Sequence, residues 1–172
     1  MQEAMQTRIL PASRILIYDP YTSTAEVVKR TAEDIFGNVG LEGIIIDTAT
    51  NAQAAKELLK REYYDLVIAG CYKDTCATET SAGIKVLEGM NPASQVIILS
   101  ADLEFTHDKL EKLGVPQQKI NLIYSESKPL HCWEALHPVR EPMLNYVNVI
   151  ETPPHYDLLK KALATTLKLS LD

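Results

Sequence analysis

Three cysteines and one histidine are the residues whose types could most directly build a reactive site. Cys71 and Cys76 are separated by four residues, and His131 directly precedes Cys132. Three thiolates with one imidazole form a good ligand set for Zn²⁺, and Cys71 with Cys76 could instead form a regulatory disulfide. The spacing is not that of a standard zinc knuckle, however, and an odd count of three cysteines suits a reducing compartment. We therefore predict no metal, and keep the zinc site as an alternative.

A second set of candidates consists of residues that follow short apolar runs. Asp19 ends the first run, Gly70 the second, and Ser100 lies near the end of the third. The runs are Arg14–Asp19 (RILIYD), Tyr63–Gly70 (YYDLVIAG) and Gln95–Ala101 (QVIILSA). Such unbroken apolar runs are typical of parallel strands that are buried on both faces. Because ligands of these folds bind beyond the carboxyl ends of the strands, we examine Asp19, Gly70 and Ser100 first.

The segment Tyr21–Thr24 (YTST) offers hydroxyl groups just before a predicted helix. It is faintly similar to the phosphate loop of flavodoxins, in which hydroxyls and a helix N-terminus hold the FMN phosphate. The glycine and asparagine expected in such a loop are missing. A flavin-binding, metal-binding or redox protein is therefore the alternative function, and we predict no cofactor.

Amphipathic helices fill the intervals between the apolar runs. Ser23 and Glu26 have the spacing of a capping box at the start of the first helix, and Asn51 is a candidate cap for the second. Stripes of apolar residues predict helices at 23–36, 52–60, 84–88, 105–113 and 156–169, and a further strand at 42–47. Strands alternating with helices predict a flavodoxin-like α/β fold, with a doubly wound, parallel, five-stranded sheet and helices on both faces.

Composition narrows the functional classes. The 172 residues suit a single domain spanning 1–172, and 46% apolar residues suffice for a core. The formal net charge is −6, and no run of five like charges occurs, so we expect no nucleic-acid partner and no membrane partner. Neither a signal peptide nor a stretch of about 20 apolar residues is present, which predicts a cytoplasmic protein.

The order of these motifs resembles the receiver domain of two-component response regulators. After RILIYD and YYDLVIAG come SAGIKVL, QVIILSA and SKP, and the resemblance covers residues 14–130 and the final helix. In that family two acidic residues after the first strand hold Mg²⁺, and an Asp after the third strand accepts a phosphoryl group. A Ser or Thr after the fourth strand senses the phosphoryl group, and a Lys-Pro after the fifth contacts it. Asp19, Ser100 and Lys128 match these positions.

The resemblance fails at the position that would accept the phosphoryl group. Gly70 stands there, and Pro20 stands in place of the second acidic residue. Phosphoryl transfer needs a carboxylate nucleophile beside Mg²⁺, which prefers carboxylate oxygens. The sequence therefore predicts a pseudo-receiver, which is a non-enzymatic signalling module that acts through protein–protein interaction. The alternatives are structural: Asp19 caps a turn, Ser100 is a satisfied hydroxyl at a strand end, and Lys128 is a solvated loop residue.

Two segments compete for the fifth strand. If it is 120–124, then Lys128-Pro129 is the Lys-Pro of the family; if it is 145–150, then Thr152-Pro153 replaces that pair and 117–143 is an insertion. We favour the first assignment because it supplies the lysine. The receiver-like domain then has a core at about 14–130, an irregular insertion at about 126–144 and a closing helix at 156–169.

Two aromatic residues are candidates for contact with a partner. Tyr124 would occupy the aromatic switch position of the family if 120–124 is the fifth strand. Trp133 lies in a proline-rich stretch, and tryptophan is enriched at interface hot spots. The partner class we predict is a signalling protein or another receiver, including a second copy of this chain. Ordinary packing is the alternative for both residues.

Overall fold

The structure is a computed structural model, and it describes residues 13–71, 82–124, 140–152 and 156–169. Its centre is a six-stranded sheet in the order β2-β1-β3-β4-β6-β5, and every pair of neighbouring strands is parallel. The strands are β1 (Arg14–Tyr18), β2 (Ile45–Ala49), β3 (Leu66–Cys71), β4 (Gln95–Ser100), β5 (Ile120–Ile123) and β6 (Val147–Glu151). The predicted parallel sheet is confirmed, but it has six strands and not five.

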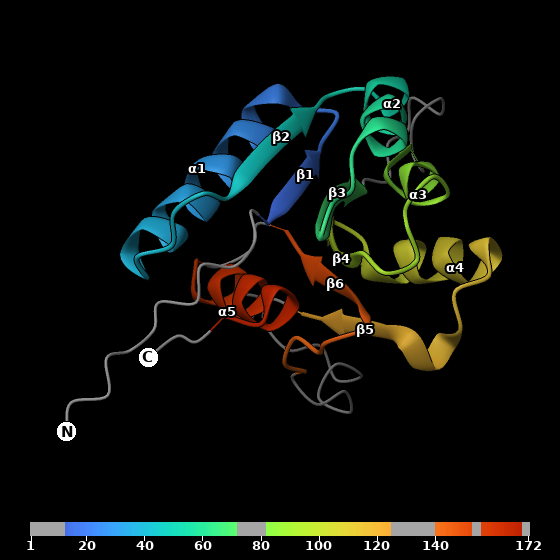
Figure 1. Cartoon of the computed structure of the whole chain (residues 1–172). Helices are drawn as coiled ribbons and strands as arrows, with labels where there is room; N and C mark the ends of the chain where they lie inside the picture. Colours follow the sequence, from blue (N-terminus) through green and yellow to red (C-terminus); the bar gives the residue numbers. More distant parts are fainter. Residues whose placement is uncertain (1–12, 72–81, 125–139, 153–155, 170–172) are drawn as a thin grey trace.

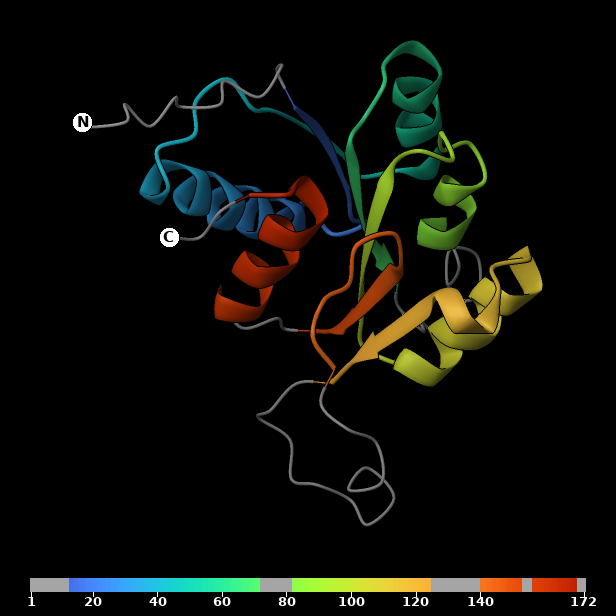
Figure 2. The same ribbon diagram turned by 60° about the horizontal axis from the view of Figure 1, so that its bottom comes forward.

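Five α-helices cover the two faces of the sheet. They are α1 (Thr22–Asn38), α2 (Ala52–Arg61), α3 (Ala82–Leu87), α4 (Leu103–Leu113) and α5 (Tyr156–Leu167), with a 3₁₀ turn η1 (Gln117–Lys119) before β5. Helices α1 and α5 lie on one face, and α2, α3 and α4 lie on the other (Figures 1 and 2). This arrangement is the doubly wound architecture that the alternating pattern predicts. Within the described ranges, no helix has both the length and the apolar character needed to cross a membrane.

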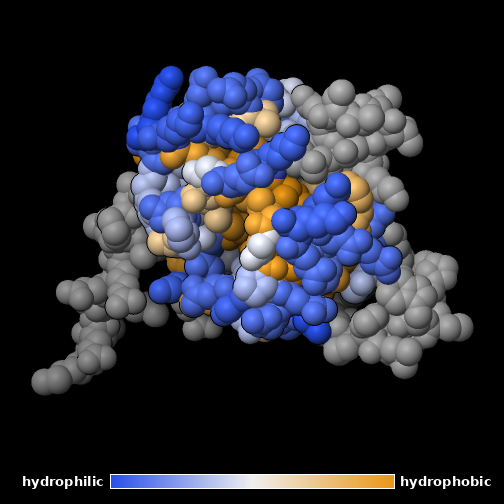
Figure 3. Space-filling model, turned by 90° about the vertical axis from the view of Figure 1, so that its right-hand side faces the viewer, coloured by the Kyte–Doolittle hydropathy of each residue, from blue (hydrophilic) through white to orange (hydrophobic). Residues whose placement is uncertain are grey.

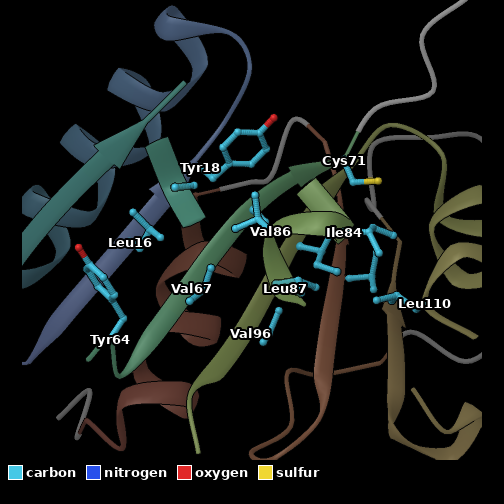
Figure 4. Packing of buried hydrophobic residues seen from close by; sticks show 14 of the residues in the cluster. Leu16, Tyr18, Tyr64, Val67, Cys71, Ile84, Val86, Leu87, Val96 and Leu110 are labelled. Carbon is cyan, nitrogen blue, oxygen red and sulfur yellow. The ribbon is translucent and has the colours of Figure 1, made fainter. Parts of the chain in front are cut away.

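The central strands are buried on both faces, which explains their unbroken apolar sequences. Every residue of β3 is buried, and β4 is buried from Val96 to Ser100. On the face covered by α2, α3 and α4, buried side chains of the sheet pack against the helices (Figure 4). The labelled contributors include Leu16, Val67 and Val96 from the sheet, Ile84, Val86 and Leu87 from α3, and Leu110 from α4. Each buried side chain of this kind contributes about 1.5 to 3 kcal/mol.

The structure confirms one of the two predicted helix caps and contradicts the other. The Asn51 side chain accepts a hydrogen bond from the Ala54 N–H at 2.7 Å, so the predicted cap of α2 is confirmed. Asp102 caps α4 in the same way, with the Phe105 N–H at 3.0 Å. Helix α1 begins at Thr22 without a side-chain cap, so Ser23 lies inside the helix and the capping-box interpretation is wrong.

The chain places its last two strands in reverse spatial order. After α4 it forms β5 at the edge of the sheet and then returns to insert β6 between β4 and β5. The favoured segment does form the fifth strand in chain order, at 120–123, but the strand beside β4 is 147–151. Both segments join the sheet because both are apolar and β-branched, which strand propensity alone could not rank.

A buried asparagine pair holds β5 and β6 in register. Asn121 and Asn148 face each other across the two strands, and both are fully buried. The Asn121 amide donates to Asn148 Oδ1 at 2.9 Å and to the Glu141 carbonyl at 2.8 Å. Asn148 Oδ1 also accepts the Met143 N–H at 2.9 Å. A shift in register would leave these buried amides without hydrogen-bond partners. The pair therefore specifies how β6 aligns with β5.

A polar network lies near the amino-terminal ends of β1 and β3. Arg14 forms ion pairs with Asp47, at 3.6 Å, and with Glu62. The Tyr64 hydroxyl, on a side chain only 1% exposed, donates to Asp47 Oδ2 at 2.8 Å. Burial raises the pKa of Tyr64 most, the Asp47 carboxylate raises it further, and the charge of Arg14 partly opposes both. The neutral phenol is therefore part of the folded structure.

We predict that Tyr64→Phe lowers the free energy of unfolding by about 1 to 2 kcal/mol at neutral pH, since a buried hydrogen bond to a charged group is lost. A raised pKa in the folded state means that this contribution is complete below the ordinary tyrosine value of about 10 and declines above it. The stability gap between wild type and variant should therefore be constant up to that pH and shrink beyond it. Urea unfolding across a pH series measures the gap.

Tyr63→Phe is the matched control, because Tyr63 is the adjacent tyrosine and is 48% exposed. It should leave the stability at neutral pH unchanged. A Tyr64→Phe protein as stable as wild type at neutral pH would contradict the proposed role of the hydrogen bond.

Candidate functional site

The candidate site lies at the carboxyl ends of the central parallel strands, which we call the carboxyl edge of the sheet. Asp19 directly follows β1, Gly70 and Cys71 end β3, and Ser100 ends β4. Cys71 is aligned with Ser100, which in turn is aligned with Glu151 at the end of β6. The structure thus brings Asp19, Gly70 and Ser100 to one edge. The other sequence-predicted residues Cys76, Lys128, His131, Cys132 and Trp133 lie outside the described residues.

Asp19 is a buried carboxylate that organises the turn into α1. It is 1% exposed, and its Oδ1 accepts the Tyr21 N–H at 2.9 Å. Its own N–H donates to the Ala49 carbonyl of β2 at 3.1 Å. This arrangement is an Asx turn, in which the side chain stabilises the backbone two residues ahead. The geometry supports the structural alternative for Asp19, because one carboxylate oxygen is already used by the turn.

Gly70 is contacted by the first turn of α3. A Cβ atom added to Gly83 would lie 2.1 Å from the Gly70 carbonyl oxygen and 3.6 Å from the Cys71 Cα. Only glycine permits this approach, since real Cβ atoms never come so close to a backbone oxygen. Helix α3 therefore begins directly against the backbone of the residue that stands in the phosphoryl-acceptor position.

The Ser100 hydroxyl is fully occupied by local hydrogen bonds. Ser100 is 0% exposed, and its Oγ donates to the Asp102 carbonyl at 2.7 Å. The same oxygen accepts the Asp102 N–H at 3.0 Å and lies 2.7 Å from Thr106 Oγ1, which can donate to it. A hydroxyl offers one donor and two acceptor sites, and all three are used here. Ser100 thus ties the end of β4 to the first turns of α4.

Cys71 completes the buried polar cluster at this edge. Burial raises the pKa of its thiol, while the Thr106 hydroxyl beside it and the charge of Lys109 oppose that change. A buried neutral thiol is a weak nucleophile and a weak metal ligand, because the thiolate is the reactive form. The described residues therefore favour an inert Cys71. The zinc and disulfide alternatives depend on residues outside the described ranges.

Two residues of this edge have roles that the sequence analysis missed. Thr106 is 0% exposed and bonds to Ser100, and Glu151 is a carboxylate only 5% exposed at the end of β6. Nothing in a helical apolar stripe marks Thr106 as a partner of Ser100. A signal for Glu151 was present in the sequence, because it directly follows the apolar run 145–150 in the way that Asp19 ends the first run.

The strand order also bears on the expected lysine and aromatic positions. The residue after the strand beside β4 is Thr152, whose N–H donates to the Ser100 carbonyl at 2.8 Å. Thr152 thus directly follows the strand beside β4, which is the position that the second alternative from the sequence gives it. Tyr124 follows β5, and β5 lies one strand further from β4 than expected. Its role as an aromatic switch residue stays a prediction from the sequence.

Comparison with solved structures identifies the fold. The signal receiver domain of an HD domain-containing protein from Pseudomonas fluorescens Pf-5 aligns with a TM-score of 0.57 at 14% identity, over 91% of this chain and 95% of that one. A response regulator from Thermotoga maritima aligns with a TM-score of 0.54 at 18% identity, over 91% and 98%. A structure described as adenylate cyclase from Rhodopirellula baltica aligns with a TM-score of 0.56 at 13% identity, over 91% and 88%. The chain therefore has the fold of receiver domains.

Sequence comparison adds nothing to this result. No family model and no curated protein sequence matches the chain. At identities below one fifth, the structural likeness establishes the fold alone, and the chemistry of the site must be argued from its own residues.

We predict that Ser100→Ala lowers the free energy of unfolding by about 1 to 3 kcal/mol, because it leaves buried partners of the hydroxyl unsatisfied. The loss should be local, so amide exchange should accelerate in the first turns of α4. Chemical unfolding with hydrogen-exchange mass spectrometry measures both effects.

Ser94→Ala is the matched control at the other end of β4. Ser94 is 7% exposed, and its hydroxyl donates to the Tyr64 carbonyl. That variant should also lose stability but should not accelerate exchange in α4 beyond the global effect. Wild-type exchange in α4 of Ser100→Ala would refute the role of the network.

Proposed function

We propose that this chain is a receiver-like signalling module that acts by protein–protein interaction and is not phosphorylated at the usual position. The observation that carries the proposal is the occupant of the acceptor position. Gly70, at the carboxyl end of β3, offers no side chain, and the first turn of α3 packs directly on its backbone. A covalent phosphoryl intermediate needs a nucleophilic side chain at that place.

The surrounding residues support the same conclusion. Pro20 replaces one carboxylate that would hold Mg²⁺, and the remaining Asp19 already uses one oxygen in its turn. Mg²⁺ retains several waters and relies on carboxylate oxygens, so a single engaged carboxylate is a poor site. Thr152, which carries no charge, directly follows the strand beside β4. In the described part of the chain, β3 ends without an acceptor carboxylate and β1 is followed by one acid of the expected pair, while Lys128 lies outside the described ranges.

The Ser100 hydroxyl, which would sense a phosphoryl group, already forms hydrogen bonds with its neighbours. Ser100 bonds to both backbone groups of Asp102 and to Thr106. Moving it toward Gly70 would break three hydrogen bonds within a buried cluster, and no phosphoryl oxygen would replace them. The β4–α4 turn is therefore held in one arrangement, and the module presents α4 constitutively.

The surface that carries α2, α3 and α4 suits a protein partner. Figure 3 shows apolar residues visible in a depression between hydrophilic ridges on this side of the molecule. Partly exposed apolar residues of these helices and the adjoining turn are Leu58, Met90, Phe105 and Leu113. Apolar surface rimmed by polar residues is common at protein interaction sites. Partner binding is the output that remains when the phosphoryl chemistry is lost.

The first test is phosphorylation. Incubated with Mg²⁺ and acetyl phosphate, the protein should gain no phosphate-sized mass, because no carboxylate follows β3 at the acceptor position. Intact mass spectrometry measures the result, and a receiver domain with an acceptor aspartate, treated in parallel, is the positive control. An acid-labile adduct on any aspartate would refute the proposal, and Asp74 would be the first residue to examine by Asp74→Asn.

The second test concerns the interaction surface around Trp133, which remains a prediction from the sequence. If Trp133 belongs to an interface, Trp133→Ala should reduce self-association. The melting temperature should change by no more than a few degrees, which corresponds to a change of about 1 kcal/mol in the free energy of unfolding. Sedimentation velocity over a concentration series, with thermal unfolding, measures both quantities.

Tyr63→Ala is the control for this variant, since it removes a half-exposed aromatic ring before β3, at the amino-terminal edge of the sheet. It should leave self-association unchanged. A large fall in melting temperature for Trp133→Ala would instead assign Trp133 to the core.

A further inference from the structure

We propose that His107, Asp108 and Glu111 on α4 form a binding site for a divalent transition-metal ion. Each residue offers one ligand atom, and the three atoms lie within 4.8 Å of one another. The site is separate from the carboxyl-end cluster and does not rest on the proposed signalling function. It concerns residues that neither the sequence motifs nor the resemblance singled out.

The distances within the group fit an ion better than direct hydrogen bonds. His107 Nδ1 lies 3.9 Å from Asp108 Oδ1 and 3.8 Å from Glu111 Oε2. Hydrogen bonds from a ring nitrogen to an oxygen span about 2.7 to 3.2 Å, so neither carboxylate is hydrogen-bonded to the ring. Two ligand atoms bound to one tetrahedral ion at about 2.1 Å lie about 3.4 Å apart, so the side chains must move slightly closer together to bind an ion. Rotation of the exposed side chains can supply this adjustment.

The helix keeps the ligands together. His107 and Glu111 are four residues apart, which places them on the same face of α4 one turn from each other. Asp102 caps the N-terminus of the helix and Gly114, with φ +98°, ends it, so both ends are defined by sequence-specific caps. The backbone is thus ordered before the metal binds, which reduces the entropy lost on binding.

The charges also favour a dication. Two carboxylates beside one imidazole carry a negative charge that a divalent ion neutralises. The nearby ammonium of Lys109 lies over the Phe105 ring, 5.3 Å from its centre, so it has a local partner other than the two carboxylates. Asp108 and Glu111 have side chains 72% and 42% exposed, so water can complete the coordination shell.

The ligand types select the class of metal. An imidazole nitrogen with two carboxylates suits Zn²⁺, Co²⁺ or Ni²⁺, whereas Mg²⁺ and Ca²⁺ prefer oxygen ligands throughout. The site thus differs in chemistry from a Mg²⁺ site at the ends of the strands. Binding there would cross-link one turn of α4 and neutralise the two carboxylates on its exposed face.

The test is a titration of the full chain with Co²⁺, monitored by its visible absorption and by calorimetry. We expect saturable binding of one ion at sub-millimolar metal, lost in His107→Gln. Glu111→Gln should lower the metal affinity by more than about tenfold, which is the loss expected when only an outer-shell partner is removed. Glu33→Gln, which removes an exposed carboxylate from α1, is the matched control and should bind as wild type does.

His131→Gln distinguishes this site from a cysteine site. Binding that survives His107→Gln but falls in His131→Gln, with intense thiolate charge-transfer bands, would overturn the proposal, as would the absence of saturable binding. Circular dichroism establishes that each variant is folded. Should His107→Gln fail to fold, the Glu111→Gln variant carries the same test, because that side chain is 42% exposed.

Discussion

Burial of both faces of the central strands is the constraint on which the rest of this structure depends. The side chains of β3 have no contact with water on either side, and those of β4 are buried from Val96 onward. Such strands can carry almost no polar chemistry along their length, because a buried polar group without a partner is strongly unfavourable. Polar and reactive groups are therefore confined to the strand ends, where Asp19, Ser100 and Glu151 lie.

Several of the polar groups that are nevertheless buried form hydrogen bonds with neighbouring groups, although Asn121 Oδ1 accepts none. Ser100 bonds within the β4–α4 turn, the Asn121 amide bonds to Asn148, and Tyr64 donates to Asp47. These contacts define the geometry of the turn, the register of the inserted strand and the amino-terminal edge of the sheet. In each case the side chain acts as a structural tie, since satisfied buried hydrogen bonds specify one arrangement. The carboxyl-end cluster is best understood in the same terms.

This protein has the fold of receiver domains but differs from them at the residue expected to accept a phosphoryl group. The likeness to receiver domains extends over most of the chain, yet Gly70 occupies the acceptor position and the first turn of α3 rests on its backbone. The same fold is found in a structure described as an adenylate cyclase, so the topology alone does not assign an activity. What this chain can do follows from the side chains at its strand ends and on the exposed face of α4.

The sequence by itself determined the class of fold and most of the strand ends. Unbroken apolar runs predicted β1, β3 and β4, apolar stripes predicted the helices, and the absence of a carboxylate at Gly70 was visible from the motif order. These features are local, because a strand buried on two faces or a helix buried on one leaves its pattern in consecutive residues.

Only the tertiary structure decided which strands are neighbours and which side chains meet. The insertion of β6 between β4 and β5 gave the sheet a sixth strand and brought Thr152 beside the end of β4. The contact of Ser100 with Thr106 and the start of α3 against Gly70 depend on how helices pack over the strand ends. Pairing between distant segments is set by side-chain packing and by satisfaction of buried amides, which no single stretch of sequence encodes.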